Sequence, residues 1–185
     1  EMVESVGRPI MGYWNIRGLG APIKMLFYHL KVDFEDRVYQ VGPAPDFDKT
    51  RWLHDKQALG LELPNLPYLI DGEVKLTETA AIMQYVCAKW RPELLGASPV
   101  EQGRAQMLWP HVLLLKDTST NMCYFGNGDI QAIVDASMPL LAKLMTAIGG
   151  SSNFIAGEHL TWLDFYFFEL VDMLDVLSGK KFQAQ

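Results

Sequence analysis

The sequence predicts an α/β domain over residues 1–90, followed by an all-helical domain over residues 91–185. Short β-like runs alternate with helical runs up to about Trp90, and beyond that residue the hydrophobic spacing is helical only. The 185 residues are 49% hydrophobic and 21% charged, which is an ordinary globular composition. There are therefore enough apolar side chains to bury a core.

The first domain is predicted to have the order β-α-β, a loop, and then β-β-α. Residues 9–14 form a short apolar run typical of a buried strand. Residues 21–31 follow as a helix whose first turn accepts a proline, and residues 34–39 alternate like a second strand. The dipeptide at residues 71–72 is Asp-Gly between two apolar runs, which indicates a hairpin. Residues 77–89 then have the apolar spacing of a helix.

The second domain opens with a clear helix-start signal at residues 98–101. This segment combines a serine cap, a first-turn proline and a glutamate that completes a capping box. The helix is predicted to reach about Tyr124, and another helix is predicted over residues 129–148. Thr161 and Asp164 form a second predicted capping box, which opens a helix rich in Phe and Leu.

The charge and hydropathy patterns argue against several partners. The net charge is −6 and no Lys/Arg cluster occurs, so a nucleic-acid partner is not expected. The most apolar stretch, residues 160–177, is interrupted by four acidic residues, which argues against a membrane span. Residues 1–7 contain no basic segment followed by an apolar one, so we do not expect a signal peptide.

Cysteine and histidine spacing favours neither a disulfide framework nor a metal site. Cys87 and Cys123 are far apart and form no C-x-x-C pattern. The four histidines have no metal-ligand spacing, so no metal is expected. Two isolated cysteines fit a reducing compartment, and we therefore expect a cytoplasmic protein.

Several motifs occur in an order that resembles a known family. They lie at residues 11–19, at residues 42–53 and at residues 56–72. Together they resemble the Mu class of cytosolic glutathione transferases. Residues 154–157, with the Thr161–Asp164 box, also resemble the capping motif of that family. The resemblance is strong over roughly residues 10–90, patchy to about residue 175 and absent in the tail.

The resemblance implies a thioredoxin-like, glutathione-binding first domain and a shortened helical transferase domain. The implied enzyme conjugates the glutathione thiolate to small electrophiles, with glutathione as co-substrate and without a metal. A free thiol has a pKa of about 8.5, so the protein must favour the nucleophilic thiolate. By resemblance, Tyr13 donates a hydrogen bond to the sulfur and stabilises its charged form. The alternative is that Tyr13 is merely an aromatic residue at a strand end.

The resemblance also implies a set of glutathione contacts: Trp14, Leu19, Trp52, Lys56, Asn65, Leu66, Pro67, Glu78 and Thr79. In the family the proline at the position of Pro67 is cis, and the residue before it offers its backbone N–H and C=O to the cysteine of glutathione. An ordinary trans proline is the alternative.

Two further groups in this set have their own alternatives. Glu78 and Thr79 open a helix whose N-terminal N–H groups suit the γ-glutamyl carboxylate, and plain capping by Thr77 and Glu78 is a compatible interpretation. Trp52 and Lys56 match positions that hold the glycine carboxylate. A lone Trp and a lone Lys in a loop, however, usually serve packing and solvation.

The remaining matches are weaker, and some positions depart from the Mu pattern. Tyr124 matches a tyrosine that faces the electrophile, and a core-facing aromatic is the alternative. An acidic residue that reaches the neighbouring subunit's glutathione falls on Leu114, and Asp117, one turn away, substitutes for it only if the register shifts. An aromatic knob that locks the dimer falls on Leu63. An arginine at the twofold axis is replaced by Gln84. The family's Gln-Ser pair is Glu-Thr at residues 78–79, which keeps the acceptor and the hydroxyl.

The family's last helices have no counterpart after about Leu177. We expect the apolar stripe from Trp162 to Leu177 to lose part of its cover and to mark an interface. The expected partners are glutathione, a small electrophile, and either a second copy in a homodimer or a protein that covers this stripe. The alternative function is a catalytically weak or inactive transferase-like protein that serves as a structural subunit or interaction module of a larger assembly. A carrier of apolar compounds is a third interpretation.

Overall fold

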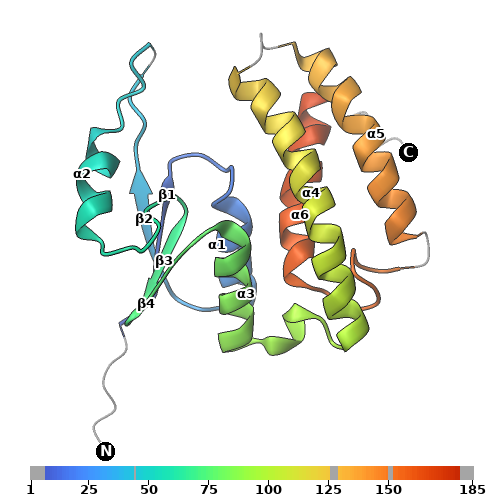
Figure 1. Cartoon of the computed structure of the whole chain (residues 1–185), viewed down its shortest axis with the longest axis horizontal. Helices are drawn as coiled ribbons and strands as arrows, with labels where there is room; N and C mark the ends of the chain where they lie inside the picture. Colours follow the sequence, from blue (N-terminus) through green and yellow to red (C-terminus); the bar gives the residue numbers. More distant parts are fainter. Residues whose placement is uncertain (1–6, 44, 126–128, 150–151, 180–185) are drawn as a thin grey trace, which may run out of the picture. The chain divides into compact units, whose positions relative to one another are not determined.

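The computed structural model describes residues 7–43, 45–125, 129–149 and 152–179, without the side chains at 124 and 125. The chain divides into two compact units, Glu1–Arg91 and Pro92–Gln185, and each is described by itself. The first unit is built on a sheet, and the second is helical (Figure 1).

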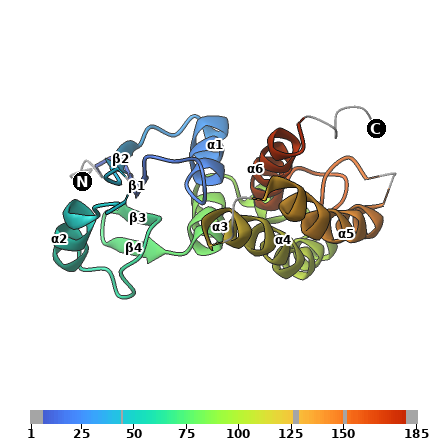
Figure 2. The same ribbon diagram turned by 90° about the horizontal axis from the view of Figure 1, so that it is seen from above.

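The first unit contains four strands and three helices among the described residues. In chain order they are β1 Ile10–Trp14, α1 Ala21–Leu30, β2 Glu35–Tyr39, α2 Thr50–Ala58, β3 Tyr68–Asp71, β4 Val74–Thr77 and α3 Thr79–Trp90. The strand order in the sheet is β2-β1-β3-β4, with β1 parallel to β2 and antiparallel to β3. Figures 1 and 2 show α1 and α3 on one side of the sheet and α2 on the other.

The central strands β1 and β3 have buried residues on both faces, because consecutive buried positions point to opposite sides of the sheet. Met11 and Leu69 are paired neighbours, and both side chains are fully buried. Helices α1 and α3 contact each other and bury apolar residues such as Phe27 and Ile82. The predicted strands, the hairpin and both helices are thus present, with ends that differ from the predictions by two residues at most.

Helix α2 is the element that the sequence analysis missed. The predicted loop between the second strand and the hairpin instead contains this helix at Thr50–Ala58. Asp48 lies just before the helix, and its carboxylate accepts a hydrogen bond from the Thr50 N–H at 2.9 Å. Trp52 is the only buried residue in the helix, so no apolar periodicity was available to predict it.

The second unit contains a 3₁₀ turn and three long helices among its described residues. They are η1 Pro92–Leu95, α4 Pro99–Phe125, α5 Ile130–Ile148 and α6 Trp162–Leu177. Helix α4 contacts both α5 and α6. Asp129 caps α5 by accepting a hydrogen bond from the Ala132 N–H at 3.1 Å. The predicted helices are therefore confirmed, and their predicted ends agree to within one residue.

The two predicted capping boxes have different outcomes. The Thr161–Asp164 box is present in both directions. At α4, the Ser98 hydroxyl accepts a hydrogen bond from the Glu101 N–H at 3.2 Å, as predicted. The Glu101 carboxylate, however, reaches the N–H of Ala97, one residue farther back than a capping box requires. Only half of that box is therefore confirmed.

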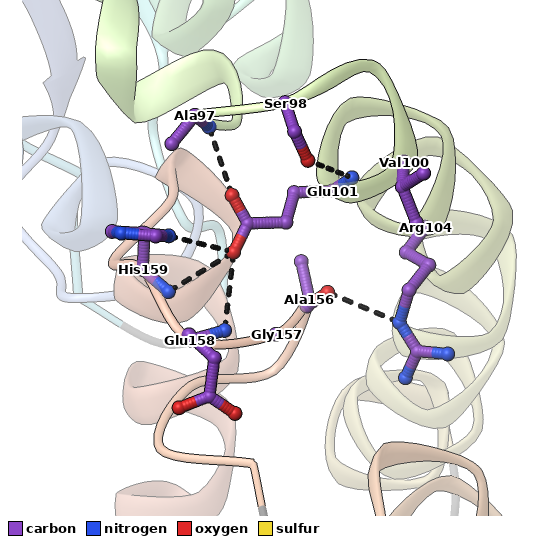
Figure 3. Close-up of a pocket in the computed structure, with 9 residues that line it drawn as sticks. All are labelled: Ala97, Ser98, Val100, Glu101, Arg104, Ala156, Gly157, Glu158 and His159. Carbon is purple, nitrogen blue, oxygen red and sulfur yellow. Dashed lines mark hydrogen bonds and ion pairs between the residues drawn. The ribbon is translucent and has the colours of Figure 1, made fainter.

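The Glu101 carboxylate also binds the loop that precedes α6 (Figure 3). It accepts hydrogen bonds from the N–H groups of Glu158 and His159 at 3.1 Å and from His159 Nδ1 at 2.9 Å. The bond from the His159 side chain is the largest of the causes that lower the pKa of Glu101. These groups line a pocket of about 290 Å³. One carboxylate thus joins the start of α4 to the loop before α6.

The exposed apolar surface of α6 is narrower than the sequence predicts. Five of its large side chains are buried: Trp162, Leu163, Tyr166, Leu170 and Leu174. Trp109 of α4 packs against two of them, with ring centroids 5.4 Å from Trp162 and 4.9 Å from Tyr166. The large apolar side chains that stay exposed on α6 are Phe168 at 59% and Val176 at 60%.

Helix α5 has an unusual composition for a surface helix. By length and composition it is apolar enough to cross a membrane, with a mean hydropathy of 1.2 and 22% of its length buried. The sequence analysis had considered only residues 160–177 for such a role. Composition alone is weak support for a span, because packed helices of soluble domains meet the same criterion, and α5 packs on α4 and α6.

The two cysteines have opposite environments. Cys87 is buried on α3, and burial raises the pKa of its thiol to about 12. Cys123 lies near the end of α4 and is exposed. Neither forms a disulfide.

Candidate active site

Tyr13 lies near the end of β1, where the chain turns toward α1. Its side chain is 5% exposed, and its hydroxyl oxygen accepts a hydrogen bond from the Leu19 N–H at 2.9 Å. A hydrogen bond donated to a phenolic oxygen stabilises negative charge there, so the hydroxyl becomes a stronger donor to a third group. This geometry suits a hydroxyl that donates to a thiolate.

Two glycines allow the turn to fold closely around the tyrosine. A Cβ atom added to Gly20 would lie 2.4 Å from Cδ1 of the Tyr13 ring. A Cβ atom added to Gly18 would lie 2.7 Å from the Tyr13 hydroxyl, and Gly18 also has a φ of +37°. The sequence analysis missed both glycines, although they flank Leu19 and were visible as a Gly-x-Gly spacing.

The N-terminus of α3 approaches the same turn. The Thr79 hydroxyl donates to the carbonyl oxygen of Leu19 at 3.5 Å, and Thr79 is buried. Glu78 is the residue before the helix, and its side chain makes no capping hydrogen bond. The Glu78 part of the predicted capping by Thr77 and Glu78 is therefore not observed, and the N-terminal N–H groups of α3 suit an anion.

Glu78 has a backbone conformation that favours glycine. Its φ is 70° and its ψ is 121°. Such conformations in non-glycine residues cost of order 1–3 kcal/mol and are concentrated at functional sites. The strained residue here lies directly beside the proposed carboxylate site at the start of α3.

The segment before β3 contacts the Glu78 side chain through Asn65. The Asn65 amide donates to the Glu78 carboxylate at 3.3 Å, and its carbonyl accepts from the Leu66 N–H at 2.9 Å. The Leu66–Pro67 peptide bond is cis, the form that the resemblance implies. Asn65 and Glu78 are both exposed, so they lie on the surface of the unit.

Trp52 and Lys56 come from α2. The Trp52 ring stacks on Tyr68, the residue after the cis proline, with centroids 6.1 Å apart. The Lys56 ammonium lies 6.0 Å from the centroid of the Trp52 ring. Trp14 is half-buried and makes an edge contact with Tyr39 at 6.3 Å.

The structure thus brings most of the predicted residues of the first unit into two linked groups. One group joins Tyr13, Leu19 and Thr79, and the other joins Asn65, Leu66 and Glu78. Tyr124 belongs to the last turn of α4, but its side chain lies outside the described residues. Within the described parts of the chain, no group of three or more His, Cys, Asp or Glu residues is placed to hold a metal ion.

This geometry defines a chemical class. A phenol with a polarised hydroxyl suits a thiolate, and an uncapped helix N-terminus suits a carboxylate. The cis Leu66–Pro67 bond directly follows Asn65, which contacts Glu78. Together these features suit a small acidic peptide that carries a thiol.

Comparisons with known proteins agree with this class. Residues 9–88 match the family described as glutathione S-transferase, N-terminal domain. A glutathione S-transferase of Dermatophagoides pteronyssinus is 39% identical over 178 residues, covering 96% of this chain and 80% of that protein. Glutathione S-transferase Mu 1 of Bos taurus is 36% identical, covering 95% of this chain and 80% of that protein. The crystal structure of the glutathione S-transferase Blo t 8 has a TM-score of 0.80 at 29% identity and covers 93% of this chain and 79% of that one.

The chain belongs to the glutathione S-transferase family. The predicted fold class, a thioredoxin-like α/β domain followed by a helical domain, is confirmed. The predicted likeness to the Mu class is confirmed as well.

Proposed function

We propose that the protein is a glutathione transferase that adds the glutathione thiolate to small electrophiles. One observation carries the proposal. The Tyr13 hydroxyl accepts a hydrogen bond from the Leu19 N–H at 2.9 Å, and the Leu19 carbonyl oxygen in turn contacts Thr79 at the start of α3. A protein that kept only the fold would not need this arrangement. The family relationship supports the same conclusion.

The proposed roles follow the chemistry of glutathione from end to end. Tyr13 donates a hydrogen bond to the sulfur, lowering the pKa of the bound thiol. Leu66 pairs with the cysteine backbone, and the α3 N-terminus at Thr79 holds the γ-glutamyl carboxylate. The Glu78 carboxylate is proposed to bind the ligand's amino group. Asn65 holds Glu78 in place through its amide.

Residues of α2 complete the proposed glutathione site. Trp52 and Lys56 are proposed to hold the glycine carboxylate, because an ammonium group suits that anion and the Lys56 ammonium lies over the Trp52 ring. Trp14 and Leu19 are proposed to contact the ligand from the β1–α1 turn. Tyr124 is proposed to face the electrophile.

We also propose the wider setting that the sequence predicts. Residues 1–90 are proposed to form the glutathione-binding domain and residues 91–185 the helical transferase domain. The proposed location is cytoplasmic, consistent with two cysteines that form no disulfide.

The proposed quaternary structure is a homodimer, which is typical of the family. Leu63 is 72% exposed and follows the acidic Glu62. Between α4 and α5 lies an apolar groove of about 240 Å³ that includes the basic residues His111 and Lys143. Leu114, which replaces the family's acidic residue, also lines this groove. We propose that Leu63 of one copy enters the groove of another.

A scaffold protein remains the alternative function. The departures at Leu63, Leu114 and Gln84 favour it, because they alter positions that serve the Mu dimer. Phe168 and Val176 of α6 are the exposed apolar residues that such a partner would cover.

The first test is calorimetric titration of the purified full chain with glutathione, followed by a conjugation assay with an aryl halide. We expect binding in the micromolar to low-millimolar range and measurable turnover. A folded sample that binds no glutathione would reject the enzyme and favour the scaffold.

A further inference from the structure

Helix α2 is attached to the rest of the first unit mainly by one side chain. Trp52 is its only buried residue. The indole contacts two tyrosines, with ring centroids 5.3 Å from Tyr39 and 6.1 Å from Tyr68. At the other end of the helix, Lys75 donates to the carbonyl oxygen of Leu59 at 2.8 Å. The position of α2 therefore depends on what fixes these two tyrosine rings.

The two tyrosines fix each other. Both side chains are fully buried, and their hydroxyl oxygens lie 3.1 Å apart in a hydrogen bond. Burial is the main cause that raises the pKa of Tyr39, so this hydroxyl stays protonated. The bond gives each hydroxyl a buried partner.

A glycine makes this pairing possible. Tyr39 lies on β2 and Tyr68 on β3, and β1 runs between these strands. Gly12 is the β1 residue paired with Tyr68, and a Cβ atom added to it would lie 2.2 Å from Cε1 of the Tyr68 ring. The Tyr68 ring therefore crosses β1 over a residue without a side chain. We call Tyr39, Tyr68 and Gly12 the tyrosine bridge.

We propose that the tyrosine bridge positions α2 for the glycine end of glutathione. The bridge residues are positioning residues, because they act through Trp52 and Lys56. This inference rests on the proposed function, and in particular on the role of α2 in holding the glycine carboxylate. The tyrosine bridge is thus expected to affect the affinity for glutathione and to leave thiol activation by Tyr13 unchanged.

The test compares glutathione with γ-glutamylcysteine, which has the same thiol and γ-glutamyl group but no glycine. Calorimetry of the full chain measures the Kd of both ligands for the wild type, Tyr39→Phe, Tyr68→Phe and the double variant. Tyr85→Phe is the matched control, since its hydroxyl bonds to Asp71 at 2.8 Å, away from α2. Circular dichroism checks that each variant is folded.

We expect each bridge variant to raise the Kd for glutathione by about tenfold, because removal of either hydroxyl breaks the buried hydrogen bond that fixes the two rings. The Kd for γ-glutamylcysteine should change by less than about twofold. The double variant should be no worse than the worse single variant, because the two hydroxyls act as one unit. With saturating glutathione, kcat and the pKa of the bound thiol should stay at their wild-type values.

Two results would overturn the inference while leaving the proposed function intact. In the first, wild-type protein binds glutathione and the variants bind it equally well. In the second, the variants lose affinity for both ligands alike, which would indicate a general structural role. A wild type that binds neither ligand would instead overturn the proposed function, and this inference with it. If Tyr68→Phe does not fold, Tyr39→Phe alone decides the question.

Discussion

The hydroxyl of Tyr13 is set by its neighbours before any ligand arrives. The Leu19 N–H and the two glycines around it hold the ring in one position. Such preorganisation matters because a donor that is already aimed costs nothing to reorient when charge develops. Changes at this residue and at its glycine contacts should therefore affect turnover more than ligand binding.

Removal of the Tyr13 hydroxyl is the most direct prediction at this scale. Tyr13→Phe should lower kcat with an aryl halide by about 10- to 100-fold, which corresponds to a charged hydrogen bond of about 1.5–3 kcal/mol. The affinity for glutathione should stay nearly unchanged. The pKa of the bound thiol should rise, so that thiolate absorbance appears at higher pH. Equal turnover in both proteins would remove Tyr13 from the mechanism.

A second prediction uses the close packing at Gly20. Gly20→Ala places a methyl group 2.4 Å from the Tyr13 ring, which must then shift. We expect turnover to fall by at least about tenfold, because even a small displacement of a catalytic group is costly. The matched control is Gly103→Ala in α4, where an added Cβ meets nothing within 4 Å. That control should keep full activity and gain up to about 1 kcal/mol of stability.

The family resemblance implied the cis form at Pro67, and the structure has it. The apolar spacing predicted a helix start close to Thr79, where α3 begins. Sequence reasoning did not identify the backbone strain at Glu78 or the steric role of Gly20. Those depend on how distant segments pack, and no local spacing records them.

At the level of elements, the Glu101 carboxylate joins α4 to the loop before α6. The stability that these hydrogen bonds contribute should depend on pH. Hydrogen bonds from His159 and from backbone N–H groups lower the pKa of Glu101 below 4.5. A carboxyl group whose folded-state pKa is lowered stabilises the fold above its unfolded pKa and loses that effect as pH falls through the lowered value. The contribution should thus be complete at neutral pH.

The corresponding variant is Glu101→Gln, measured by urea unfolding at several pH values. We expect it to be less stable than the wild type at neutral pH, with a difference that shrinks as pH falls below 4.5. Glu93→Gln, at an exposed glutamate in η1, is the control and should show little change at any pH. A difference that is the same at all pH values would contradict the assignment.

Helix caps give another prediction at the level of elements. Asp164 accepts hydrogen bonds from the Ile155 N–H, the Thr161 N–H and the Thr161 hydroxyl at 2.7–2.8 Å. Asp129 caps α5 by accepting a hydrogen bond from the Ala132 N–H. We expect Asp164→Ala to cost about 2 kcal/mol of unfolding free energy and Asp129→Ala about 1 kcal/mol. Chemical denaturation measures both, and equal losses would contradict this ranking.

Elements with periodic apolar faces or strong caps were predicted well, and α2 was not. The hairpin at residues 68–77 and the box at Thr161 each carry a local signal. Helix α2 has a single buried side chain, and its attachment depends on Tyr39 and Tyr68, which are distant in sequence. The reach of Glu101 to the loop at residues 158–159 is also a long-range contact that the capping pattern did not contain.

At the scale of the whole molecule, the apolar surfaces bear on assembly. We expect the wild-type chain to sediment as a dimer and Leu63→Glu to sediment as a monomer, because a charge would be desolvated in the groove between α4 and α5. Leu53→Glu, the same substitution at an exposed α2 leucine, should leave the dimer intact. A wild-type monomer, or a dimer that persists in Leu63→Glu, would contradict the proposed Leu63 contact. The exposed Phe168 and Val176 would then be the surface to test for a partner.

A protein that brings thiolates and electrophiles together exposes its own thiols to the same reagents. The Cys87 thiol is shielded twice, because it is buried and because a pKa of about 12 leaves only about one part in 100,000 ionised at neutral pH. Cys123 has neither protection of burial nor a disulfide partner. Electrophiles should therefore modify the Cys123 thiol first during turnover. The covalent adducts should accumulate near the end of α4 and not in the core of the first unit.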